Sequence, residues 1–132
     1  DATVFVYLQD LAPDGELTYI TEGQFRAIHR KESQEEPPYP QIGPYHTFKK
    51  TDALEVVPNE PFRLRFALLP TSYLLRKGHR LQVAIAGTDK EHFEVLADAP
   101  DILNILINEE MKTKMKIKST ILSINFYHLV VH

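Results

Sequence analysis

The chain has 132 residues, of which 43% are hydrophobic and 25% charged, an ordinary composition for one globular domain. Its net charge of −3 gives no basic field for a nucleic-acid backbone, and its apolar runs are far shorter than the roughly 20 residues that span a bilayer. It contains no cysteine, which excludes disulfides and thiolate sites, and no visible secretion leader, so we expect a cytoplasmic location.

The N-terminal residues predict a β-hairpin. Residues 3–8 are apolar on both faces, which is typical of a buried central strand. Residues 12–16 contain the proline and glycine of a tight turn, and residues 17–21 return as the second strand. Residues 24–28 continue that strand if Gly23 forms a bulge. Because an interior strand opens the sequence, we expect the chain to be cut from a longer protein.

Residues 30–50 interrupt the strand pattern. Proline removes backbone donors and fixes φ, so we expect a long surface loop here. Three side chains of this loop are candidates for stacking on a sugar or lining a substrate entrance: Tyr39, Tyr45 and His46. The alternative is that they pack the loop onto the edge of the sandwich.

The middle of the chain predicts three more strands. Residues 53–57 form a short one, and the alternation in residues 62–68 and 81–85 predicts two strands with one buried face each. Between the last two, we expect residues 73–75 to fill a corner and the glycine of residues 76–79 to turn the chain.

The last third allows two interpretations. Residues 99–111 could form a short helix, or residues 102–107 a strand followed by a basic, solvent-facing segment at 112–118. Residues 120–131 predict a closing strand. Short strands punctuated by proline and glycine indicate an all-β jelly-roll sandwich, with residues 1–132 forming one domain.

Several turn-and-strand pieces occur in an order typical of one hydrolase family. They are Asp1-Ala2-Thr3, the turn from Asp10 to Gly15, Gly23 with Arg26-Ala27, Pro58-Asn59-Glu60-Pro61, Arg76 to Leu81, and Gly87-Thr88-Asp89. In this order, the run from Asp1 to Phe93 resembles the C-terminal domain of the X-Pro dipeptidyl-peptidase and cocaine-esterase-like hydrolases.

The resemblance implies a jelly roll similar to galactose-binding domains, packed on an α/β-hydrolase catalytic domain and a helical cap. The family's Ser-His-Asp triad lies in the α/β domain, so no catalytic residue is carried over. The strands that precede Asp-Ala-Thr in the family have no counterpart here, and no proline follows Pro100. We therefore expect an unpaired sheet edge and self-association of the chain.

The chain's own nucleophiles and histidines do not predict an active site. The chain has four serines, Ser33, Ser72, Ser119 and Ser123. None of them lies in a Gly-x-Ser-x-Gly elbow. His128 and His132 have the spacing of a zinc pair on a helix, but on a strand they lie about 13 Å apart at ~3.3 Å per residue. We interpret both as surface residues.

Two charged groups have simple structural interpretations. Asp10, Asp14 and Glu16 could hold calcium, but a hairpin turn explains them, and we expect no metal and no cofactor. Six basic residues alternate with core positions or follow them, and we expect them to form a solvated or interdomain face: Arg63, Arg65, Arg76, Lys77, His79 and Arg80. They lack the helix or the aromatic platform that nucleic-acid binding would need.

The leading hypothesis is a non-catalytic domain that stabilises a serine hydrolase of esters or proline-adjacent peptides and shapes its active-site entrance. Its expected partners are the α/β-hydrolase catalytic domain, the cap, and a second copy through a sheet edge, with no nucleic acid and no membrane. The alternative is a free-standing carbohydrate- or protein-binding module. A third hypothesis is that the chain has enzymatic activity of its own.

Overall fold

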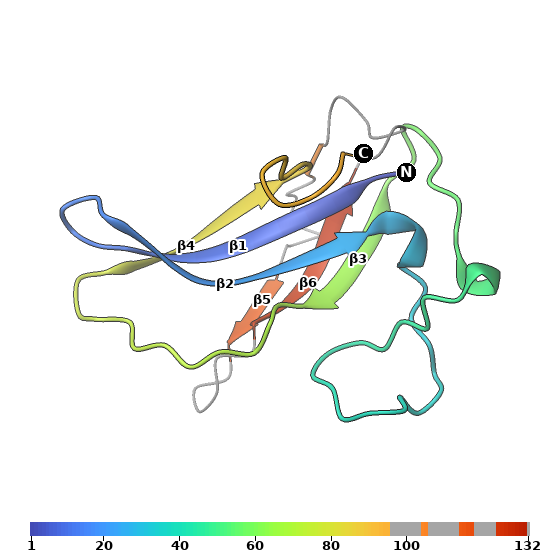
Figure 1. Cartoon of the computed structure of the whole chain (residues 1–132), viewed down its shortest axis with the longest axis horizontal. Coiled ribbons are helices and arrows are strands. Elements are labelled where there is room, and N and C mark those ends of the chain that lie inside the picture. Colours follow the sequence, from blue (N-terminus) through green and yellow to red (C-terminus); the bar gives the residue numbers. More distant parts are fainter. Residues whose placement is uncertain (96–103, 106–113, 118–123, 132) are drawn as a thin grey trace.

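The computed structural model describes residues 1–95, 104–105, 114–117 and 124–131, and most of its elements are strands. They are β1 (Thr3–Leu11), β2 (Leu17–Arg26), β3 (Phe62–Ala67), β4 (Arg80–Ala86), β5 (Lys114–Ile117) and β6 (Ile124–Val131), with the short 3-10 helices η1 (Ala27–His29) and η2 (Lys50–Asp52). The strands form two antiparallel sheets, of order β2-β1-β4 and β3-β6-β5, that lie one over the other (Figure 1). The predicted all-β sandwich is confirmed. No helix in the described ranges is long and apolar enough to cross a membrane.

The predicted N-terminal hairpin is present, but its bulge lies elsewhere than predicted. In the turn, Gly15 adopts a φ of 93° and its N–H donates to the Ala12 carbonyl at 3.0 Å. The ladder pairs Leu8 with Thr21 and Gln9 with Tyr19, which leaves Ile20 as the extra residue of the bulge. The bulge predicted at Gly23 is therefore wrong.

Gly23 serves a different purpose, close packing between the sheets. It pairs regularly with Val6 in the β1–β2 ladder. A Cβ atom added at Gly23 would lie 2.8 Å from Leu68 Cδ2 and 3.1 Å from the Ala67 carbonyl oxygen. Only glycine therefore lets β2 approach the end of β3 this closely.

The core lies between the two sheets and follows the period-2 pattern of the sequence. Its buried apolar side chains come from β1, β2 and β3 and their ends: Ala2, Val4, Val6, Leu8, Ile20, Phe25, Ala27, Leu64, Phe66 and Leu68. The Phe25 and Phe66 rings stack across the sheets with their centroids 5.3 Å apart. On β4, three partly buried side chains complete the core: Leu81, Val83 and Ile85.

Two predictions for the middle of the chain are wrong. Residues 53–57 do not form a strand, because the Leu54 N–H donates to the Ile28 carbonyl at 2.8 Å and the Arg30 side chain binds two carbonyls of the segment. The corner is not filled by residues 73–75 together. Tyr73 packs against the core, whereas Leu74 is 82% exposed.

In the last third, β6 confirms the predicted closing strand and pairs with β3. The basic loop predicted at residues 112–118 is wrong for residues 114–117, which form β5 and pair with β6. The helix predicted at 99–111 and the alternative strand at 102–107 lie outside the described residues, apart from residues 104–105.

Candidate functional site

The proline-rich loop of residues 30–50 extends away from the sheets at one end of the sandwich (Figure 1). Residues 31–49 contain no helix or strand, as predicted. Polar side chains rather than a backbone ladder fix the course of the loop, and three groups of contacts do this.

The first contact is made by His46, which is only 5% exposed. Its Nδ1 lies 3.0 Å from the Lys31 carbonyl oxygen and its Nε2 lies 2.9 Å from the Arg65 carbonyl oxygen. A neutral ring can donate to one of these carbonyls, and an imidazolium to both. The ring also packs on Phe25 at 4.6 Å between centroids. His46 therefore ties the loop to β3 from inside the protein.

The second contact is made by Arg30, at the beginning of the loop. Its guanidinium donates to the carbonyls of Ala27 at 3.1 Å, Leu54 at 3.0 Å and Glu55 at 2.7 Å. It also lies over the Phe62 ring, 5.1 Å from the centroid. Burial lowers the pKa of this guanidinium. Sequence reasoning missed this role, because no local pattern marks a side chain that binds carbonyls 24 and 25 residues away.

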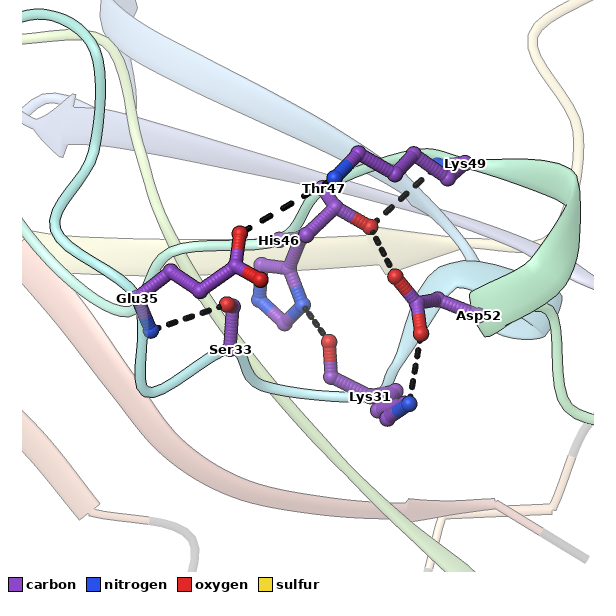
Figure 2. A network of polar contacts seen from close by, with 7 residues as sticks. All are labelled: Lys31, Ser33, Glu35, His46, Thr47, Lys49 and Asp52. Carbon is purple, nitrogen blue, oxygen red and sulfur yellow. Dashed lines mark hydrogen bonds and ion pairs between the residues drawn. The ribbon is translucent and has the colours of Figure 1, made fainter.

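The third contact is a polar network between the loop and η2, shown in Figure 2. The Lys31 ammonium lies 2.5 Å from one Asp52 oxygen, and the Thr47 hydroxyl donates to the other at 2.6 Å. The hydrogen bond from Lys31, followed by that from Thr47, lowers the pKa of the Asp52 carboxyl. Beside this network, Arg65 on β3 forms an ion pair with Glu32 at 2.8 Å.

Two grooves flank the loop. A polar groove of about 400 Å³ is lined by Lys31, Glu32, Ser33, Gln34, Glu35, Thr47 and Asp52. A second groove of about 520 Å³, which we call the Pro40–Pro70 groove, is lined by Pro40, Gln41, Ile42, Leu68 and Pro70. The Pro40–Pro70 groove is mostly apolar, and its buried Gln41 amide nitrogen has no hydrogen-bond partner within the described part of the chain.

The structure does not bring the three predicted loop residues together on one surface. His46 is buried and both of its ring nitrogens face backbone carbonyls. Tyr39 is 54% exposed beside the Pro40–Pro70 groove, where Ile42 is 47% exposed. Tyr45 is partly buried, and its carbonyl accepts the Ser33 N–H at 2.8 Å. Tyr39 therefore remains the best placed of the three to meet a partner.

The acidic residues of the hairpin turn are also separated. Asp10 is 3% exposed and accepts hydrogen bonds from the Tyr73 hydroxyl at 2.8 Å and from His79 at 3.0 Å. Asp14 instead accepts the Glu16 N–H at 3.1 Å, as an Asx turn does. The Asp10 carboxylate thus joins β1 to the corner that precedes β4, and its hydrogen bond raises the pKa of Tyr73. In the described ranges, no three histidine or acidic residues cluster in a way that could hold a metal ion.

A similar cluster lies at the other end of β4. The Tyr7 hydroxyl donates to Asp89 at 2.5 Å, and His92 Nδ1 lies 3.1 Å from the same carboxylate. The bond from Tyr7 lowers the pKa of Asp89, and the bond to Asp89 raises the pKa of His92. Burial, with the bond to Asp89, raises the pKa of Tyr7. This cluster fixes the segment after β4 onto β1.

His46 binds backbone carbonyls, and His79 and His92 bind carboxylates; among the described residues, no hydrogen bond joins a histidine to a serine hydroxyl. The Ser33 hydroxyl accepts the Glu35 N–H at 3.1 Å (Figure 2). Ser119, Ser123 and His132 lie outside the described residues, and His128 lies on strand β6 rather than on a helix. The described residues therefore contain two grooves, and none of the hydrogen bonds among them pairs a serine with a histidine.

A family model, the X-Pro dipeptidyl-peptidase C-terminal non-catalytic domain, matches residues 1–101. The chain belongs to this family. It is also 57% identical over 96 residues to two curated proteins named "Putative serine esterase", one from Mycobacterium bovis (strain ATCC BAA-935 / AF2122/97) and one from Mycobacterium tuberculosis (strain CDC 1551 / Oshkosh). The match covers 73% of this chain and 15% of each relative, so the chain spans a small part of their length. No solved structure matches the chain.

The comparisons confirm the family resemblance found in the sequence. The family is described as a non-catalytic domain. The matched region covers β1 to β4, the proline-rich loop and both grooves. Residues 102–132, which include β5 and β6, lie outside the family match.

Proposed function

We propose that this chain is the accessory domain of a serine hydrolase of esters or proline-adjacent peptides, where it packs on the α/β-hydrolase catalytic domain and its cap. Family membership and the names of the mycobacterial relatives support this proposal. The observation that carries it is the Pro40–Pro70 groove, a mostly apolar surface lined by Pro40, Gln41, Ile42, Leu68 and Pro70. An apolar side chain from a hydrolase loop would bury this surface.

In this proposal the loop of residues 30–50 borders the entrance to the hydrolase's active site. His46, Arg30 and the Asp52 network hold the loop in one conformation before docking, which lowers the entropic cost of association. Tyr39 and Ile42 then present apolar side chains from a fixed base. We also propose that the chain by itself self-associates through a sheet edge.

The test is a domain exchange in the full-length mycobacterial relative, whose matching 96-residue segment is replaced by that of this chain. We expect the exchanged protein to hydrolyse a chromogenic ester with its melting temperature preserved. Ile42→Asp in the exchanged protein should lower the melting temperature and raise KM, since a charge enters the docking groove. The matched control Glu36→Asp changes an exposed loop residue outside both grooves. Equal behaviour of the two variants would overturn the proposed docking surface.

The free-standing binding module is a less favoured function. The polar groove of about 400 Å³ is large enough for a sugar, but its charged residues Lys31, Glu32 and Asp52 already form ion pairs with protein groups. No aromatic ring lines the groove to stack on a sugar face. Docking onto a hydrolase would use the Pro40–Pro70 groove instead, whose lining residues carry no charge that an ion pair could occupy.

A further inference from the structure

We propose that the connection between β3 and β4, residues 68–79, docks onto an apolar face with an acidic rim on the hydrolase part of the same polypeptide. The connection runs from the end of β3 past β2 to the start of β4 (Figure 1). It begins at the Pro40–Pro70 groove, since Leu68 and Pro70 line that groove. The inference rests on the proposed function and deepens it by naming a second docking surface.

Three leucines of the β3–β4 connection are exposed. Leu74 is 82% exposed and Leu69 is 58% exposed, and Leu75 is also exposed to solvent. Single exposed leucines are common on protein surfaces and need no explanation. Three of them within residues 69–75, next to an apolar groove, form a concentration of apolar surface that is typical of a protein–protein contact.

The connection is held in place at both of its ends, although its leucines are exposed. Near its beginning, the Leu69 N–H donates to the Glu22 carbonyl of β2 at 2.8 Å. Near its end, the buried Asp10 carboxylate of β1 accepts hydrogen bonds from the Tyr73 hydroxyl at 2.8 Å and from His79 at 3.0 Å. The leucines therefore project from a fixed base, and a surface that is fixed before docking loses little conformational entropy on association.

Three cations follow the leucines along the chain. Arg76 and Lys77 lie in the connection and Arg80 begins β4, and all three are exposed. None of them forms a salt bridge among the residues that the structure describes, although the neighbouring hairpin turn carries the exposed carboxylates of Asp14 and Glu16. Cations at the edge of an apolar surface favour a partner with acidic groups at matching positions, because complementary charges speed association and exclude wrong partners.

The partner is the hydrolase rather than a second copy of this chain. The family is a C-terminal non-catalytic domain, and the match spans only 15% of each mycobacterial relative, so most of such a protein lies outside this domain. A contact between two copies through the same surface would bring the three cations of each copy to one interface, where like charges repel each other. A different partner with acidic groups avoids this repulsion.

The test places one substitution in two settings, the isolated chain and the domain-exchanged mycobacterial relative. Leu74→Asp should leave the melting temperature of the isolated chain unchanged, because the side chain is exposed there. In the exchanged protein it should lower the melting temperature by several degrees, since a carboxylate then enters an apolar contact beside acidic groups. Leu54→Asp is the matched control. It changes another exposed leucine, outside both grooves and the connection, and should have the same effect in both settings.

Charge reversal tests the acidic rim of the partner face. Arg76→Glu/Lys77→Glu should lower the melting temperature of the exchanged protein and spare the isolated chain, where both side chains are exposed. The difference between this variant and the exchanged parent should shrink at high salt, because salt screens the charges. Thermal unfolding at low and high salt measures the difference. A charge-reversed variant as stable as the exchanged parent at both salt concentrations would refute the acidic rim.

The outcomes separate this inference from the proposed function. Equal effects of Leu74→Asp in both settings would overturn the docking role of the connection, whereas a loss of stability in Ile42→Asp would still support the hydrolase contact at the groove. An exchanged parent without ester hydrolysis would overturn the proposed function, and this inference with it. A dimer of the isolated chain that forms in sedimentation and is abolished by Leu74→Asp would assign the surface to a second copy, and would also contradict the inference.

Discussion

His46 Nε2 lies 2.9 Å from the carbonyl oxygen of Arg65, a contact that joins the proline-rich loop to strand β3 inside the protein. The other nitrogen of the same ring contacts the Lys31 carbonyl. One side chain therefore connects the beginning of the loop to β3. The shape of the proposed docking surface therefore depends on a residue that does not itself reach the surface.

His46→Leu should destabilise the chain by about 1–3 kcal/mol, because it removes the buried polar ring that lies between the Lys31 and Arg65 carbonyls and packs on Phe25. Urea unfolding measures the loss. His29→Leu is the matched control, since His29 is less buried and contacts Phe48 without a hydrogen bond to the protein backbone among those described. A His46 variant no less stable than the control would contradict the internal tie.

Gly23→Ala should destabilise the chain by about 1–3 kcal/mol through overpacking against Leu68 and the Ala67 carbonyl. The added methyl group lies within 2.8 Å of Leu68 Cδ2, so Leu68→Ala should relieve part of the cost in a double-mutant cycle. Thermal unfolding of the four proteins supplies the cycle. Strictly additive effects would show that the two residues do not meet.

Arg30→Lys should cost about 1–2 kcal/mol, because a lysine cannot reproduce the planar fork that binds the carbonyls of Ala27, Leu54 and Glu55. Hydrogen exchange should show faster exchange at the Leu54 amide, which donates to Ile28. Arg63→Lys, at an exposed position of β3, is the control and should leave this amide protected. Unchanged Leu54 protection in Arg30→Lys would refute the anchoring role.

The Asp52 network predicts a pH dependence with a definite sign. Because the folded pKa of Asp52 lies below its unfolded value of about 3.9, its contribution is present above that pH and is lost as the pH falls through the folded pKa. The stability difference between the parent chain and Asp52→Asn should therefore shrink as the pH drops below about 4. Denaturant midpoints measured from acidic to neutral pH give the difference. A gap that widens on acidification would contradict the ion pair with Lys31.

Strand positions were predictable from the sequence where local alternation coincides with burial. Leu64 and Phe66 alternate with Arg63 and Arg65, and the structure buries the first pair. The turn at Gly15 was likewise predictable, because a positive φ requires a residue of its type.

The failures share one cause, which is that partners distant in sequence decide the outcome. Residues 53–57 have a strand-like composition, but Arg30 and Ile28 take up their backbone groups. Gly23 resembles a bulge residue, yet its role is set by Leu68, which follows strand β3 of the other sheet. At the candidate site, the sequence suggested the loop but could not show that His46 faces inward while Tyr39 faces outward.

The central claim is that this domain supports a hydrolase without performing the chemistry itself. The most direct measurement is the hydrolysis of a chromogenic ester and of an X-Pro dipeptide anilide by the purified chain, beside the domain-exchanged relative. The account predicts no turnover above the buffer blank for the chain alone and ester turnover by the exchanged protein. Turnover by the chain alone that disappears in a serine-to-alanine variant would contradict it.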